Sequence, residues 1–221
     1  SMGGIDVVDY KTCGTVVPGL FAAGEASCVS IHGANRLGGN SLADAVVFGK
    51  VAGEGAVAYV AEHSQAHAKQ ALDDAAKYWE NRFTEVTSRK DGRPIAEIRD
   101  EMANAMWNKV GIFREAGKMQ EALDTLNKLI EEYKTCFVGD TNRTFNMAFV
   151  NYVEVGSLLT VAKAAVMGAM RRKESRGSHL REDFPKRDDK NFVNHTLITL
   201  NANGEYEVGQ RDVVVTRFEP K

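Results

Sequence analysis

The chain has 221 residues, and its 43% hydrophobic content is enough to bury the core of one large domain or two small ones. A formal net charge of -2 excludes a general polyanion-binding surface, so we expect no nucleic-acid partner. The three cysteines form no CxxC pair, which argues against a disulfide framework and a zinc or iron-sulphur site and favours a reducing compartment.

The N-terminal residues SMGGIDVVDY lack the basic and apolar regions of a signal peptide. No stretch reaches about 18 consecutive apolar residues, so we expect a soluble chain that meets a membrane only through a partner. Met2 is consistent both with a start codon and with an internal position of a longer protein.

Residues 1–63 have the pattern of an α/β segment. The stretch after the Pro18-Gly19 turn predicts a short strand at Leu20 to Ala23, buried on both faces. A helix is predicted from Ser41 to about His63, and its small side chains favour close packing against a sheet. Such packing would compensate for the glycines within that helix.

The sequence HGANRLGGNSL, residues 32–42, places Arg36 in a glycine-rich turn directly before the predicted helix. Ser41 followed by Asp44 is typical of an N-cap with a capping box, which predicts that the helix begins there. A helix start suits an anion, and a nearby guanidinium suits a carboxylate. The alternative interpretation is structural: glycines that form tight turns, and an ion pair between Glu25 and Arg36.

The following residues predict a mainly helical region. Residues 64–97 form a polar, partly helical connector with a loop at SRKDGRP, and residues 98–172 carry three apolar stripes at helical spacing. Three such stripes joined by short connections predict an antiparallel three-helix bundle. The stripes are Ile98, Met102, Met106, Val110 and Phe113; Met119, Ala122, Leu123, Leu126, Leu129, Ile130 and Tyr133; and Phe145, Phe149, Tyr152, Val153, Leu159, Ala162 and Val166.

Residues 173–221 are predicted to form a charged connector and a β-hairpin tail. The stretch RRKESRGSHLREDFPKRDDK, residues 171–190, has 8 basic and 5 acidic residues. Its mixed signs favour internal or interfacial ion pairs over binding of phosphate or RNA. Alternating β-branched residues on both sides of NANGE predict the hairpin.

Two other candidates for chemistry have simpler explanations. His63 and His67 have the i, i+4 spacing of metal ligands, but no third ligand lies nearby, so we expect exposed helix-end histidines and no metal. Cys28 lies in an apolar context and is predicted to be a small packed residue instead of a nucleophile.

The sequence resembles a known family in several motifs. MGGI, VPGLFAAGEASCVSIHGANRLGGNSLADAVVFGKVAGE, NKVGIFREAGKMQEAL and ESRGSHLREDFPKRDD are similar to the flavoprotein subunit of succinate dehydrogenase and fumarate reductase. The resemblance covers nearly the whole chain, which it implies to be the C-terminal portion of a longer subunit. The implied fold is α/β plus all-α: the remnant of a Rossmann-like FAD-binding domain, then the bundle and the small β element.

The resemblance also implies roles for individual residues. Glu25 matches the glutamate that binds a ribose of FAD, and Arg36 matches the arginine that grips a carboxylate of succinate or fumarate. Ser41 and Leu42 match positions whose backbone meets the flavin ring, and His32 is expected to be a positioning residue. The family has a further substrate-binding histidine just before the MGG motif, at a position that this sequence does not include. We therefore assign no catalytic residue to this chain and expect it to be inactive by itself.

The implied reaction is hydride transfer between a dicarboxylate and flavin. The implied partners are an iron-sulphur protein subunit and, indirectly, membrane anchor subunits, on the cytoplasmic side of the inner membrane. Two alternatives remain: a flavoenzyme similar to L-aspartate oxidase, which shares the HGANRL type of motif, and a non-catalytic helical module that binds a partner through residues 171–190.

Overall fold

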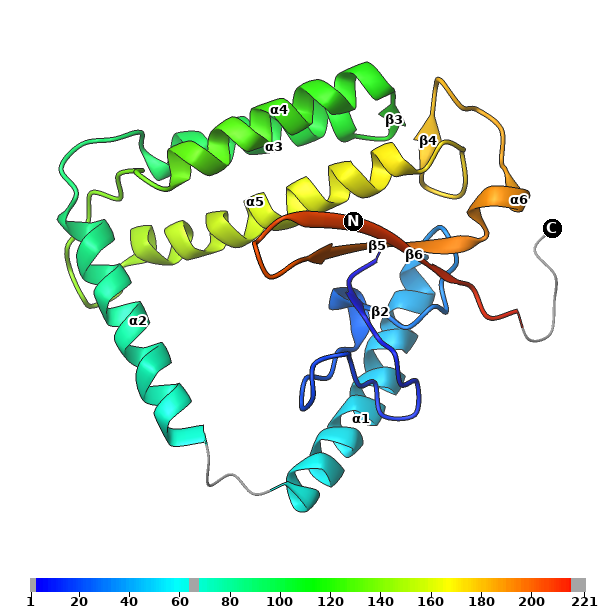
Figure 1. Cartoon of the computed structure of the whole chain (residues 1–221), viewed down its shortest axis with the longest axis horizontal. Coiled ribbons are helices and arrows are strands. Elements are labelled where there is room, and N and C mark those ends of the chain that lie inside the picture. Colours follow the sequence, from blue (N-terminus) through cyan, green and yellow to red (C-terminus); the bar gives the residue numbers. More distant parts are fainter. Residues whose placement is uncertain (1–2, 64–67, 216–221) are drawn as a thin grey trace. The chain divides into compact units, whose positions relative to one another are not determined.

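The computed structural model describes residues 3–63 and 68–215, which form two compact units (Figure 1). The first unit contains the described residues up to Lys69, the short segment Arg176–Ser178 and the residues from Val213. The second unit contains Gln70–Ser175 and His179–Asp212.

The first unit is built on one long helix, α1, which spans Gly38–Glu62. A two-residue strand β1 (Ile5–Asp6) pairs in parallel with β2 (Ser27–Cys28), and the 3-10 helix η1 (Gly24–Ala26) comes directly before β2. The segment before α1 packs on this helix through a small apolar core. Its members are Val7, Cys13, Ala22 and Val29, against Phe48, Val51 and Ala52 of α1.

The structure corrects two expectations for this unit. Residues 20–23 form no strand: Phe21 makes a single antiparallel bridge to Gly14, and Ala22 alone in this run is buried. Among the glycines of α1, Gly55 has the predicted close neighbour, since an added Cβ would lie 2.6 Å from the Thr12 carbonyl oxygen. Gly49 has open space around it, so close packing does not compensate for its low helix propensity.

The second unit contains the predicted helical bundle. Helix α2 begins at the end of the first unit and spans Ala68–Ser88, α3 spans Ile95–Val110, α4 spans Ala116–Tyr133 and α5 spans Met147–Arg171. Figure 1 shows α3, α4 and α5 side by side, and each pair is in contact. The periodic stripes therefore predicted this architecture correctly.

The bundle core is apolar and contains nearly all of the predicted stripe positions. Two predicted members are wrong: Phe113 is 64% exposed because it lies beyond the end of α3, and Phe145 is 92% exposed because it precedes α5. Helix α5 has the length and apolar composition of a membrane-spanning helix, but one of its faces packs in this core. The largest fully buried members are Val86, Ile98, Met119, Leu126, Leu129, Tyr152, Val155, Leu159 and Val166.

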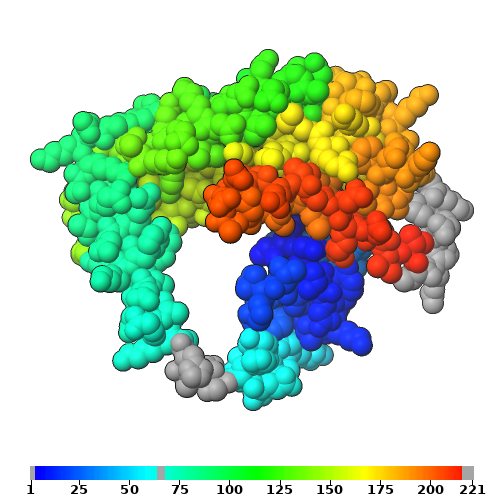
Figure 2. Space-filling model, in the orientation of Figure 1, coloured from blue at the N-terminus to red at the C-terminus, as the bar shows by residue number. Residues whose placement is uncertain are grey.

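Small β elements complete the second unit. Strand β3 (Phe113–Arg114) pairs in parallel with β4 (Leu180–Arg181), and β5 (Asn194–Leu200) pairs antiparallel with β6 (Tyr206–Asp212). The second pair is the predicted hairpin, with Leu200 opposite Tyr206. It lies on α5, where the orange and red strands border the yellow helix in Figure 2.

The charged segment between α5 and the hairpin contains a short helix, α6 (Asp189–Phe192), and makes internal ion pairs as predicted. Glu174 is fully buried, and its carboxylate accepts hydrogen bonds from Arg172 at 2.6 Å and from the Asp188 amide at 2.8 Å. Burying a carboxylate without hydrogen-bond donors costs free energy, so the fold keeps both of these bonds. They hold the segment that follows α5 in one conformation.

Arg181 and Asp183 connect the end of α5 with the start of α4. The buried Arg181 guanidinium donates from Nη1 to the Ala169 and Arg172 carbonyl oxygens at 3.2 and 3.0 Å. It also forms a two-point ion pair with Asp183, with both distances 2.7 Å. Asp183 Oδ2 in turn accepts from the Ala116 amide at 3.1 Å. One ion pair therefore caps both helix ends.

His179 lies beside this arginine cluster in a neutral form. Its Nε2 lies 3.1 Å from the Arg172 carbonyl oxygen, so this nitrogen carries the proton, and Nδ1 accepts from Arg114 at 2.8 Å. Burial lowers the pKa of His179, and the positive charge of the neighbouring arginines lowers it further.

Candidate functional site

The candidate site lies at the N-terminus of α1, which begins three residues earlier than predicted. Leu37, in an extended conformation, precedes the first helical residue Gly38 and provides no side-chain cap. The Ser41 amide already donates to the Leu37 carbonyl at 2.8 Å, so Ser41 lies in the first turn and is not the N-cap. The amides ahead of Ser41 have no partner earlier in the helix and can bind another acceptor.

Asp44 does not form the predicted capping box. Its side chain is completely buried, and its Oδ2 atom lies 2.8 Å from Arg36 Nη2 and 2.9 Å from His32 Nε2. The alternative pairing of Arg36 with Glu25 is also wrong, because Glu25 makes no ion pair within the described residues. Arg36 therefore has its counter-ion in the second turn of α1.

Two further contacts hold the Arg36 guanidinium, whose side chain is 9% exposed. Its Nε donates to the Ser41 hydroxyl at 2.6 Å, and its Nη1 donates to the Gly24 carbonyl at 3.4 Å. Contacts from α1 and from η1 thus fix both the position and the plane of the group. A guanidinium fixed in this way is suited to two-point recognition of a carboxylate.

A pocket of about 170 Å³ lies beside this cluster on α1. Because an ionised Asp44 can only accept, His32 must carry a proton on Nε2. His32 Nδ1 and Asp44 Oδ1 are buried and have no hydrogen-bond partner among the described residues. A polar group in the pocket that can both donate and accept, such as a water molecule, would satisfy both atoms. The lining residues are Ile31, His32, Asn40, Ala43, Asp44, Val47 and Phe48.

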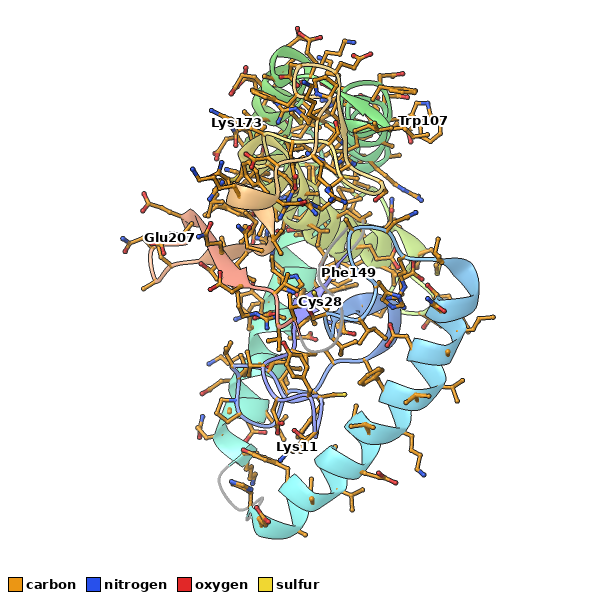
Figure 3. The ribbon with its side chains drawn as sticks, turned by 90° about the vertical axis from the view of Figure 1, so that its right-hand side faces the viewer. Lys11, Cys28, Trp107, Phe149, Lys173 and Glu207 are labelled. Atoms are coloured by element: carbon orange, nitrogen blue, oxygen red, sulfur yellow. The ribbon has the colours of Figure 1, made fainter. Side chains whose placement is uncertain are left out.

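Glu25 and Leu42, the other two predicted site residues, are both exposed near the same end of α1. An added Cβ at Gly24 would lie 3.5 Å from the Ala45 Cα atom, so η1 packs directly on the first turns of the helix. Glu25 follows Gly24 with its carboxylate in solvent, and Leu42 is 73% exposed. Figure 3 shows side chains of α1 projecting away from the helix into open space.

One part of this site was not predicted from the sequence. Ala34, two residues before Arg36, accepts hydrogen bonds at its carbonyl from both the amide and the hydroxyl of Ser178, each at 3.1 Å. Gly177 has a positive φ of 56°, and a Cβ at this position would overlap the Ala34 carbonyl. These residues are 144 positions apart in the sequence, so no local pattern could indicate the contact.

The described residues contain no group of three metal-ligating side chains. His63 stacks on Tyr59 with ring centres 3.8 Å apart, and its Nδ1 lies 2.8 Å from the Tyr59 carbonyl oxygen. His67, the second member of the predicted histidine pair, lies outside the described residues. Cys28 is half-buried in β2, as expected for a packed residue.

Comparison with known families matches both ends of the chain. Residues 99–221 match the family described as fumarate reductase flavoprotein C-term, and residues 1–42 match a family described as FAD binding domain.

Comparison with curated proteins identifies relatives that are much longer than this chain. The chain is 47% identical over 220 residues to the 8-methylmenaquinol:fumarate reductase flavoprotein subunit of Wolinella succinogenes, covering 99% of this chain and 36% of that protein. It is 41% identical over 222 residues to the fumarate reductase flavoprotein subunit of Escherichia coli, covering 100% of this chain and 36% of that protein. The chain thus spans about a third of the length of these relatives.

Solved structures give the same result. A structure of Escherichia coli quinol fumarate reductase matches with a TM-score of 0.91 and 41% identity, covering all of this chain and 37% of that chain. The Mycobacterium smegmatis Sdh1 complex matches with a TM-score of 0.84 and 32% identity, covering 97% of this chain and 36% of that chain.

Proposed function

Since this chain belongs to the family of fumarate reductase and succinate dehydrogenase flavoprotein subunits, we propose that it forms the C-terminal part of an FAD-dependent enzyme that interconverts succinate and fumarate. The observation that carries the proposal is Arg36, held in a fixed plane by Asp44, Ser41 and Gly24 at the start of α1. In this role Arg36 binds one carboxylate of the dicarboxylate substrate.

The residues around α1 fit FAD. The uncapped N-terminus of α1 offers backbone amides and the positive end of the helix dipole, which suit the electron-rich edge of a flavin ring. The exposed Glu25 carboxylate has no partner among the described residues and can accept from ribose hydroxyls. Ser41 and Leu42 lie in the first turns, where their backbone meets the ring in this proposal. Bound FAD supplies the two-electron redox chemistry.

We assign the first unit to the C-terminal part of a Rossmann-like FAD-binding domain. The parallel β1–β2 pair, η1 and the long α1 support this assignment, because helix N-termini beside parallel strands are the usual dinucleotide sites. By analogy with its relatives, we propose an iron-sulphur subunit and membrane anchor subunits as partners. With these partners, the proposed location of the protein is the cytoplasmic side of the inner membrane.

The test is Arg36→Lys in the flavoprotein that carries this chain. An ammonium keeps the positive charge but cannot reproduce the planar two-point contact, so succinate oxidation should fall by roughly a hundredfold or more while FAD content stays unchanged. Arg99→Lys, at an exposed arginine of α3, is the matched control and should have full activity. Unchanged turnover in Arg36→Lys would refute the assignment.

A further inference from the structure

We propose that Asp44 is a positioning residue for the substrate-binding arginine, an inference that rests on the proposed function. It acts through Arg36 and does not touch substrate itself. Its carboxylate fixes the plane of the guanidinium before the substrate arrives.

The burial of Asp44 supports this role. The Asp44 side chain has no exposed surface, and a carboxylate in such a place requires strong donors to offset its lost hydration. Arg36 and His32 provide them on one oxygen atom, Oδ2, at 2.8 and 2.9 Å. A capping carboxylate would need neither of these side-chain donors, because it accepts from the backbone amides at its own helix end.

The rigid placement of the Arg36 guanidinium supports it as well. Arg36 lies in a loop, where a long side chain would otherwise sample many rotamers and lose that freedom on binding. Asp44 and Ser41 project from the same helix and hold two different nitrogens of the guanidinium, Nη2 and Nε. Two contacts from one rigid element determine the plane of the group, which is the quantity that two-point carboxylate binding depends on.

His32 also holds the Asp44 carboxylate, at the same oxygen atom as Arg36. Its Nε2 proton is donated to the same oxygen that Arg36 contacts, so the carboxylate cannot rotate without losing both bonds. His32 is thereby also a positioning residue, one step further from the substrate.

A purely structural ion pair would place Asp44 in the same surroundings, so the experiment must separate the two roles. A double-mutant cycle does so, with Asp44→Asn, Arg36→Lys and both together in the FAD-loaded flavoprotein. The probe is malonate, a non-reacting dicarboxylate, with its Kd measured from the change in flavin absorbance. FAD content and thermal stability are recorded for each variant.

If Asp44 acts through Arg36, Asp44→Asn weakens malonate binding by roughly ten- to a hundredfold in the wild-type background and has little effect once Arg36 is lysine. Equal losses in both backgrounds, or no loss in either, would overturn the inference. Glu54→Gln removes an exposed carboxylate from the same helix and should leave malonate affinity unchanged.

Asp44→Glu covers the case in which the asparagine variant does not fold. It keeps the charge but lengthens the side chain, so FAD binding should persist while malonate affinity falls by an intermediate factor. Misfolding of both variants would indicate a structural role and count against the inference. If Arg36→Lys itself keeps full malonate affinity, the proposed substrate clamp is wrong; if it loses affinity and Asp44→Asn does not, this inference alone fails.

Discussion

Replacing Gly156 by alanine tests the packing inside the helical bundle. Gly156 lies in the interior of α5, where alanine would normally stabilise the helix by about 1 kcal/mol. An added Cβ, however, would lie 2.5 Å from the Tyr133 hydroxyl oxygen and 2.8 Å from its Cζ atom. The Tyr133 ring stacks on Tyr152 with centres 4.6 Å apart, so it cannot move away without disturbing the core.

The steric cost of the added methyl group exceeds the gain in helix propensity, so Gly156→Ala should destabilise the bundle. Forcing a methyl group into a packed site costs about 1–3 kcal/mol. Displacing the ring also breaks the 3.0 Å bond from the Tyr133 hydroxyl to the Tyr152 carbonyl, which costs about 1 kcal/mol more. After the gain in helix propensity is subtracted, Gly156→Ala should lower the free energy of unfolding by about 1–3 kcal/mol.

The assay is urea unfolding followed by tryptophan fluorescence, because Trp79 and Trp107 both lie in the second unit. Gly168→Ala on the same helix is the matched control. Its Cβ would meet Thr196 at 3.8 Å, an ordinary contact, so this variant should be as stable as wild type or more stable by up to about 1 kcal/mol. If both variants were equally stable, the close contact with Tyr133 would have no energetic role and our reasoning would be wrong.

Three further predictions concern titration and thiol chemistry. Because the pKa of His179 is lowered in the fold, the unfolded chain binds more protons, and the second unit should lose stability as pH falls below about 6.5. Urea midpoints at two pH values measure this loss, which His179→Gln should reduce. The hydrogen bonds from Arg181 lower the pKa of Asp183 to about 2, so a separate contribution present above about pH 4 should disappear between about pH 4 and pH 2, but not in Asp183→Asn. Burial raises the pKa of the Cys136 thiol, so maleimide labelling followed by mass spectrometry should modify it only when urea unfolds the bundle; rapid labelling of the folded chain would contradict its burial.

The helical bundle could be predicted because its evidence is local. Each stripe repeats within a window of about 20 residues, and burial of one face is enough to decide the helix. The errors at Phe113 and Phe145 fall just outside helix ends, where the apolar spacing continues in the sequence but the backbone is no longer helical. The hairpin followed from its turn residues in the same way.

The candidate site was only partly predictable. The motif singled out Arg36, whose proposed role in substrate binding stays a prediction, but the capping rule assigned Ser41 and Asp44 to roles that the structure contradicts. The rule assumes that the first serine starts the helix, whereas the glycines before it allow an earlier start and leave both side chains for Arg36. The contact between Ala34 and Ser178 depends on tertiary structure alone and has no signal in either local sequence.

The ion pair of Arg181 with Asp183 has a consequence for the order in which the chain is completed on the ribosome. The carbonyl of Ala169 near the end of α5 is synthesised 12 residues before the guanidinium that caps it, and the first amide of α4 leaves the tunnel earlier still. All three bundle helices are therefore made before the shared cap of α4 and α5 exists. The bundle can close along its apolar stripes at once, but its open end stays hydrated until Asp183 has emerged.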